Sequence, residues 1–203
     1  MAKPETHLDE HYRERFVDAG TSEARARVER ALAVVDAVRL EPEVLENSDV
    51  SEKERADLGR ALGKFARVAR LNDEPARALD AWKEAIEIWR ELGREKARFL
   101  AELEYATTCA EDESGDGEDV TTLFLSLQHR LDEDEAFSLY ADFLAEHRAR
   151  WHAANARFDE ALACITRALE LRRARGNAKH IATTEALRAR IERARETDHG
   201  ARA

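Results

Sequence analysis

Two histidines near the amino end have the spacing of a metal site. The segment His7-Leu8-Asp9-Glu10-His11 matches the pattern HxxEH, in which histidines four residues apart on one helix face bind zinc and the glutamate activates water. No third ligand can be assigned to it, and a chain with 7 His and 43 Asp plus Glu can produce such a match by chance. We therefore interpret the segment as a solvated helix face and keep a metal-dependent hydrolase as a minor alternative.

A second candidate is the acidic segment 111–119. Within it, the stretch Asp112-Glu113-Ser114-Gly115-Asp116-Gly117 places oxygen donors at positions one, three and five of an EF-hand loop and glycine at position six. Position twelve is Leu123, where calcium coordination requires a bidentate glutamate. We expect a flexible acidic connector here, and the sequence leaves calcium binding open.

The two cysteines nominate no nucleophile. Cys109 and Cys164 lie 55 residues apart inside helical patterns, so they form no CxxC motif and no disulfide framework, and we expect semi-buried thiols. The phosphate-binding patterns GxxxxGK[ST] and GxGxxG are absent from the sequence, and no Ser-His-Asp or Cys-His arrangement is recognisable by spacing. The sequence thus predicts no enzyme, no metal and no cofactor.

A basic face follows the predicted helix 52–71. One side of this helix carries the apolar residues Leu58, Leu62, Phe65 and Ala69. The opposite side carries Arg60, Lys64, Arg67 and Arg70. Because a guanidinium group pairs bidentately with a carboxylate, this face can bind an acidic peptide or a terminal carboxylate. In a chain this rich in arginine, the alternative is an ordinary solvated face.

Composition limits the partners and the compartment. The 203 residues include 43 Asp plus Glu against 33 Lys plus Arg, a formal net charge of -10. Such a chain is a poor binder of nucleic acid or anionic membranes, because that binding depends on basic side chains that neutralise phosphate. No stretch approaches the roughly 20 apolar residues that span a bilayer, and no apolar signal segment is present at the start. We expect a cytoplasmic protein that binds neither nucleic acid nor membrane.

Apolar residues spaced three and four apart dominate the chain, which predicts helices and no strands. The pattern predicts about nine helices, at approximately 5–19, 22–40, 52–71, 74–92, 95–111, 120–127, 133–154, 158–175 and 178–196. Asp73-Glu74-Pro75 predicts a carboxylate cap, with proline in the first turn of helix 74–92. We expect residues 1–50 to pack as extra helices on an array formed by 51–196, with a disordered tail at 197–203.

The chain repeats itself at an offset of 83 residues. Residues 77–93 and 160–176 are identical at six positions. The identical pairs are Ala78/Ala161, Leu79/Leu162, Ala85/Ala168, Glu87/Glu170, Arg90/Arg173 and Gly93/Gly176. Half of the offset is 41 to 42 residues, and a degenerate copy at the midpoint places Phe124 near the position of Trp82. We infer three helix pairs, each of which buries its apolar face by stacking on the next.

This arrangement resembles the tetratricopeptide repeat over residues 58–93 and 142–176. In that family the second helix of each pair begins with alanine, has a bulky apolar residue four positions later and a further alanine three after that. The matching residues are Ala78-Trp82-Ala85 and Ala161-Ile165-Ala168. The chain departs from the family in its longer period, against the usual 34 residues, and in Arg148 and His152, where an apolar and an aromatic residue are expected.

The resemblance implies a right-handed α-solenoid of antiparallel helix pairs, whose first helices line a concave surface. Arg60, Arg67 and Arg70 match ligand-facing positions of the family, and Arg150 does so in the third pair. The family's asparagine-containing carboxylate clamp is not reproduced in this sequence. We therefore predict an adaptor or scaffold that holds an acidic partner segment on this surface. The runner-up is a protein that self-assembles into a homo-oligomer through the ends of the array.

We expect the three tryptophans to differ in burial. Trp82 occupies a repeat position and is expected in the core. Trp89 and Trp151 have no such position, and we expect one of them to be a partly exposed contact for another chain.

Overall fold

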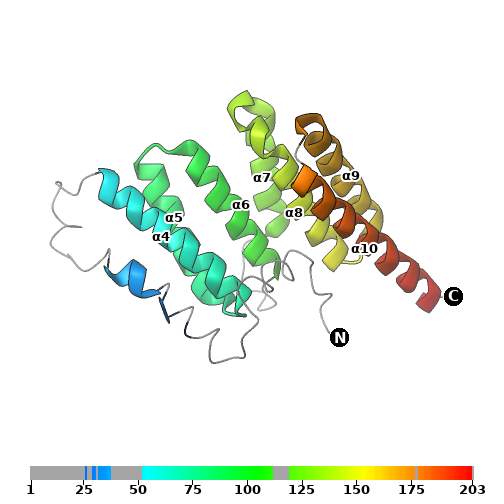
Figure 1. Ribbon diagram of the computed structural model, residues 1–203, viewed down its shortest axis with the longest axis horizontal. Helices are drawn as coiled ribbons and strands as arrows, with labels where there is room; N and C mark the ends of the chain where they lie inside the picture. Colours follow the sequence, from blue (N-terminus) through cyan, green and yellow to red (C-terminus); the bar gives the residue numbers. More distant parts are fainter. Residues whose placement is uncertain are drawn as a thin grey trace. The chain divides into compact units, whose positions relative to one another are not determined.

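The computed structural model describes residues 26, 29–30, 32–37, 52–111, 119–176 and 178–202. Within them, the elements with defined bounds are seven α-helices and one 3-10 helix, and no strand occurs. The helices are α4 (Glu52–Leu71), α5 (Pro75–Glu91), α6 (Glu95–Glu111), α7 (Val120–Glu133), η1 (Glu135–Tyr140), α8 (Ala141–Ala154), α9 (Phe158–Arg175) and α10 (Ala178–Arg202) (Figure 1). The all-helical class is confirmed, with eight helices in this part of the chain where the sequence predicts about nine overall.

The amino-terminal predictions can be compared only in part. The predicted helix 5–19 lies outside the described residues. Of the predicted helix 22–40, residues 26, 29–30 and 32–37 are described and helical, and Val35 within them is buried in the core.

The chain separates into two compact units, and among the described residues the boundary lies between Leu123 and Phe124. We call the described residues up to Leu123 the first unit and those from Phe124 the second unit. The sequence treats 51–196 as one array, whereas these residues are divided between both units.

In the first unit, α5 packs against both α4 and α6 (Figure 1). Arg94, just before α6, pairs with Glu52 at the start of α4, and Arg70 at the end of α4 pairs with Glu111 at the end of α6. These two contacts show that α4 and α6 run in the same direction as neighbours. The core between the helices is built from small and aromatic side chains, among them the fully buried Ala78 and Ala85.

In the second unit, α9 packs against both α8 and α10. Phe143 on α8 meets His180 on α10, and Glu146 accepts a hydrogen bond from the Thr184 hydroxyl, so α8 and α10 are also neighbours. Ala161 and Ala168, the counterparts of Ala78 and Ala85, are again fully buried in the core.

The two units share their corner geometry at an offset of 83. Asp73 and Ala156, one in each corner between first and second helix, both have positive φ, 59° and 55°. The side-chain amides of Asn72 and Asn155 donate to the carbonyl four residues earlier, at 2.6 and 2.8 Å. The second helices likewise end at glycines with φ of 61° and 71°, Gly93 and Gly176. The repeat in the sequence is therefore also a repeat of backbone conformation.

Three local predictions differ from the structure. The helix predicted from about 133 to 154 is divided into η1 and α8. Asp134 has extended backbone and its carboxylate accepts from Ala136 N, which starts a new turn. Arg175 then donates to the carbonyls of Ser138 and Leu139, which an α-helix would use for its own hydrogen bonds.

The predicted carboxylate cap at α5 is wrong, although Pro75 does stand in the first turn. Glu74 is the N-cap residue, but its side chain makes no cap hydrogen bond. Its carboxylate instead accepts from Arg77 at 2.6 Å, so the guanidinium occupies the group that would cap the helix. At the carboxyl end, α10 continues through Arg202, beyond residue 197, where the sequence predicts a disordered tail.

Candidate functional site

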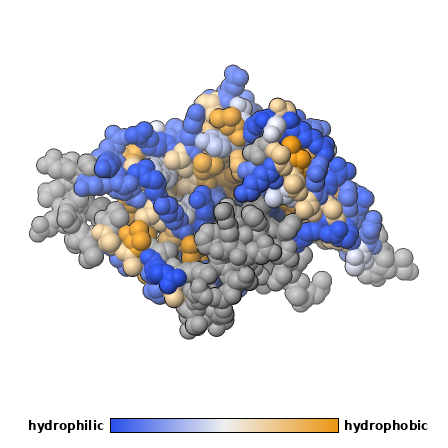
Figure 2. Space-filling view, in the orientation of Figure 1, coloured by the Kyte–Doolittle hydropathy of each residue, from blue (hydrophilic) through white to orange (hydrophobic). Residues whose placement is uncertain are grey.

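Three basic residues form an open row on α4. Arg60, Lys64 and Arg67 are spaced four and three residues apart, so they lie on one face of the helix, and all three are exposed. The opposite face, carrying Leu58 and Leu62, is buried in the core of the first unit. The surface over α4 is mainly hydrophilic where it is visible (Figure 2). We refer to Arg60, Lys64 and Arg67 as the α4 row.

The members of the α4 row differ in what they already bind. Arg60 pairs with Asp57 one turn earlier, at 2.5 Å, and this hydrogen bond lowers the pKa of Asp57. Arg67 donates through Nε to Glu104 at 3.0 Å, and its guanidinium lies 5.6 Å from the centre of the Trp82 ring. Lys64 makes no ion pair with another described residue. Exposed pairs of this kind are weak, so a partner carboxylate can compete for these cations.

Arg70 is set apart from the row by burial. Its side chain is only 10 % exposed and donates to both carboxylate oxygens of Glu111, at 3.0 and 2.9 Å. Glu104 lies 3.9 Å away on the same helix, α6. The arginine therefore joins α4 to α6, and its cation is already neutralised within the first unit.

Arg150, the fifth predicted binding residue, belongs to the second unit and is largely buried. It pairs with Glu146 at 2.5 Å, one turn earlier on α8. The residues that correspond to Arg60 and Lys64 at the offset of 83 are Phe143 and His147, and both are half-buried. Of the two aligned sets, the open row is thus found in the first unit, and Arg150 belongs to the second unit, where it is bound by Glu146.

The second unit contains a buried ionic cluster that the sequence analysis missed. Arg172 on α9 is 3 % exposed and donates to Asp142 at 2.9 Å, to Glu146 and to the Thr184 hydroxyl. Burial alone would raise the pKa of Glu146, but the cations of Arg150 and Arg172 outweigh it and hold that pKa below its ordinary value. The sequence held one signal for this cluster. The offset of 83 aligns Arg172 with Trp89, so an arginine stands where the repeat has a large aromatic residue.

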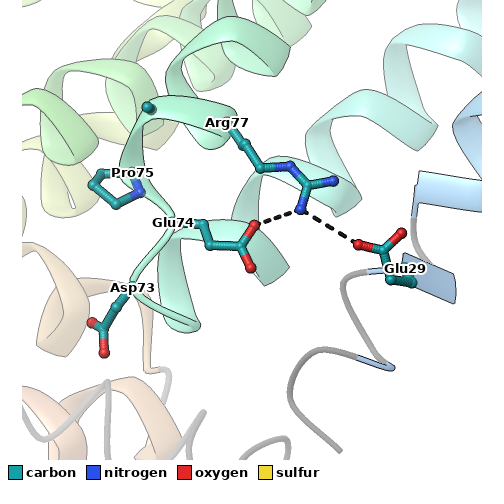
Figure 3. Close-up of a pocket in the computed structure, with 6 residues that line it drawn as sticks. Glu29, Asp73, Glu74, Pro75 and Arg77 are labelled. Atoms are coloured by element: carbon teal, nitrogen blue, oxygen red, sulfur yellow. Dashed lines mark hydrogen bonds and ion pairs between the residues drawn. The ribbon is translucent and has the colours of Figure 1, made fainter. Parts of the chain in front are cut away.

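A shallow pocket of about 580 Å³ opens at the start of α5 (Figure 3). Among the described residues that line it, Arg77 is the one basic residue, and its guanidinium lies between the carboxylates of Glu74 and Glu29, at 2.6 and 3.6 Å. Because acidic residues outnumber this cation and already bind it, the pocket offers little to an anionic ligand.

The two candidate metal-binding segments of the sequence cannot be compared with the structure. His7 and His11 lie outside the described residues, as does the acidic stretch 112–118. No group of three or more His, Cys, Asp or Glu side chains suited to a metal ion occurs in the part of the chain that the structure describes. Asp119 has a structural role, since it accepts hydrogen bonds from Thr121 N and the Thr122 hydroxyl at the start of α7, and these bonds lower its pKa.

The tryptophans and cysteines are mainly core residues. Trp82 is buried as expected, and Trp89 is also buried, against Gly59. Trp151 is half-buried, with the Arg157 guanidinium 4.1 Å from the centre of its ring. Cys109 is buried and Cys164 is half-buried, and burial raises the pKa of the Cys164 thiol. A raised pKa disfavours the thiolate, so nothing marks Cys164 as a nucleophile.

Comparison with known proteins assigns no family. No protein-family model, no curated protein and no solved structure matches this chain. The likeness to the tetratricopeptide repeat remains a prediction from residues 58–93 and 142–176. Separately, no described helix has the length and apolar character needed to cross a bilayer.

Proposed function

We propose that this chain is a non-enzymatic helical-repeat protein, in which helix pairs stack as in a right-handed solenoid of the tetratricopeptide type. The observation that supports it most directly is the corner geometry repeated at an offset of 83, with positive φ at Asp73 and Ala156 and at Gly93 and Gly176. A second support is the constant spacing of contacts between neighbouring parallel helices. Contacts of α4 with α6, and of α8 with α10, join residues 37 to 41 positions apart in the chain. Stacked pairs of this kind present long surfaces to partner segments.

The proposed binding surface is the α4 row, and the proposed partner is an acidic protein segment. Arg60, Lys64 and Arg67 are the exposed members of the predicted site and are held by weak contacts at most, whereas Arg70 and Arg150 are held by carboxylates of the chain itself. Three cations spaced over two helical turns suit a segment with several carboxylates, and the excess of acidic residues elsewhere on the chain directs such a segment to this face.

The test is titration of a fluorescent decaglutamate peptide at low and at physiological salt. We expect the unmodified protein to bind it, with affinity that falls as salt rises. The variant R60E/K64E/R67E should bind roughly 10-fold or more weakly, because each lost charge pair is worth up to about 1 kcal/mol. The matched control K83E/R90E/R94E makes the same change in net charge on other exposed positions and should bind as the unmodified protein does.

Two results would count against this function. Equal loss in both triple variants would mean that net charge alone governs binding, and absence of peptide binding to the unmodified protein would remove the acidic-segment proposal. Light scattering at several protein concentrations separates the alternative of self-assembly, which predicts a stable oligomer that added peptide does not change.

A further inference from the structure

The space between the first and second helices is filled by apolar groups in the first unit. Gly59 and Gly63 on α4 lack side chains where the indoles of α5 approach. A Cβ atom at Gly59 would lie 2.8 Å from Cζ2 of Trp89, and one at Gly63 would lie 3.2 Å from Cζ3 of Trp82. The Trp89 indole therefore occupies the volume that a side chain at Gly59 would need. We call Gly59, Gly63 and Trp89 the apolar slot.

The corresponding space in the second unit is filled by charged groups. At the offset of 83, Gly59 aligns with Asp142, Gly63 with Glu146, and Trp89 with Arg172. The guanidinium of Arg172 binds both carboxylates, and all three side chains are at most 5 % exposed. We call Asp142, Glu146 and Arg172 the ionic slot.

Two further aligned positions also change from an apolar residue in the first unit to a polar or charged residue in the second. Ala101 on α6 is buried in the core of the first unit, whereas its counterpart on α10, Thr184, donates its hydroxyl to Glu146 at 3.3 Å. Leu92, packed against the core of the first unit, aligns with Arg175, which binds Asp142. Five aligned positions thus differ together, from apolar or absent side chains to a connected polar network, while the alanines that surround them are kept.

The two units are similar enough for their second helices to compete. The segments 77–93 and 160–176, which contain most of α5 and α9 and the glycines that follow them, share six identities in seventeen aligned positions. The alanines of these helices that are kept in both, Ala78 and Ala85 in α5 and Ala161 and Ala168 in α9, are fully buried. A chain that contains two such similar helix pairs can mispair, either within one molecule or by exchanging a helix with a second copy.

We propose that the two slots form a pairing code, which restricts α5 to α4 and α9 to α8. If α9 docked on α4, Arg172 would be buried against Gly59 and Gly63 without a carboxylate. If α5 docked on α8, the Trp89 indole would meet the carboxylates of Asp142 and Glu146. In the first exchange Arg172 loses both carboxylates, and in the second Asp142 loses Arg172 and Arg175 while Glu146 keeps only Arg150. Burying charge that has lost its partners is strongly unfavourable. Correct pairing alone keeps the ions matched and the indole in an apolar space.

The test is the double variant W89R/R172W in the full chain, which exchanges the tryptophan of one slot with the arginine of the other; we call it the crossed variant. This variant places arginine opposite the glycines and tryptophan opposite the carboxylates. We expect its melting temperature to fall by roughly 10 °C or more, or its mass to rise to that of an exchanged dimer in light scattering. The control R173W makes the same arginine-to-tryptophan change at the neighbouring exposed position and should melt within about 3 °C of the unmodified protein.

The second variant exchanges both slots completely, as G59D/G63E/W89R with D142G/E146G/R172W. Since the arginine introduced by W89R again faces two carboxylates and the tryptophan introduced by R172W faces two glycines, we expect this variant to recover at least half of the melting temperature that the crossed variant loses and to regain the unmodified mass. The proposal is overturned if the crossed variant behaves like R173W. It is equally overturned if the complete exchange recovers none of the lost melting temperature, because the three residues of each slot would then not be enough to determine pairing.

Discussion

Trp89 and Arg172 occupy equivalent positions of the two units, 83 residues apart, and both side chains are buried between a first and a second helix. Trp89 is accommodated by the missing side chain of Gly59, and Arg172 by the carboxylates of Asp142 and Glu146. One backbone geometry therefore supports two different chemistries at the same place, and each depends on residues of the facing helix.

Replacing Gly59 with alanine should destabilise the protein. A helical glycine-to-alanine change gains about 1 kcal/mol in helix propensity, but overpacking costs about 1 to 3 kcal/mol. At Gly59 the new Cβ meets a rigid indole at 2.8 Å, which places the overpacking cost at about 2 to 3 kcal/mol, so we expect a net loss of about 1 to 2 kcal/mol in the free energy of unfolding, measured in urea. The variant G63A, with its contact at 3.2 Å, should change little and serves as the matched control. Equal effects would mean that the Trp89 contact is not tight.

Replacing Ala156 with glycine should stabilise the second unit. Ala156 has φ of 55°, a left-handed conformation that costs an L-residue roughly 1 to 2 kcal/mol. After the extra entropy of unfolded glycine is subtracted, we expect a gain of about 0.5 to 1 kcal/mol in unfolding free energy. D73G should gain less, because aspartate tolerates this conformation better than alanine does. The control A154G, at the helical end of α8, should instead lower stability.

Arg70 should contribute more to stability than Arg60. Arg70 is nearly buried and donates twice to Glu111, whereas Arg60 is exposed and paired with Asp57. We expect R70A to lower the unfolding free energy by about 2 kcal/mol, and R60A by less than about 0.5 kcal/mol. Urea denaturation of both variants provides the comparison. Similar losses in the two variants would contradict the structural role assigned to Arg70 and would make it a candidate binding residue again.

Glu146 should make stability fall at acid pH. Because its pKa is lowered on folding, the ionised carboxylate stabilises the fold at every pH above the ordinary glutamate value, about 4.3. That contribution is lost as the pH falls through the folded pKa. At pH 7 we expect E146Q to lose about 2 to 4 kcal/mol, since Arg150 and Arg172 keep their charge but lose a partner.

The measurement is the melting temperature from pH 7 to pH 3. The curve of E146Q should lie below that of the unmodified protein at pH 7 and fall less steeply below about pH 4.3. Curves that stay parallel over the whole range would show that protonation of Glu146 does not limit stability.

Much of the helical layout could be predicted from local sequence. The helices at 52–71, 95–111 and 158–175 have the predicted bounds, because apolar spacing and helix-ending residues act within a few turns of one another. Periodicity did not predict the division of 133–154, because it reports apolar spacing and neither the local turn at Asp134 nor the contact of Arg175, from α9, with the carbonyls of η1.

For the candidate site, the sequence alone determined that arginines and a lysine lie on one face of α4, since spacing places side chains around a helix. Only the tertiary structure decided which of those cations are open. Glu111 closes around Arg70 from another helix, 41 positions along the chain, while Lys64 meets no such group among the described residues. The same holds for Arg172, whose burial depends on carboxylates 30 and 26 positions earlier. Periodicity reports the direction of a side chain, but its charge partners come from whichever helix packs against it.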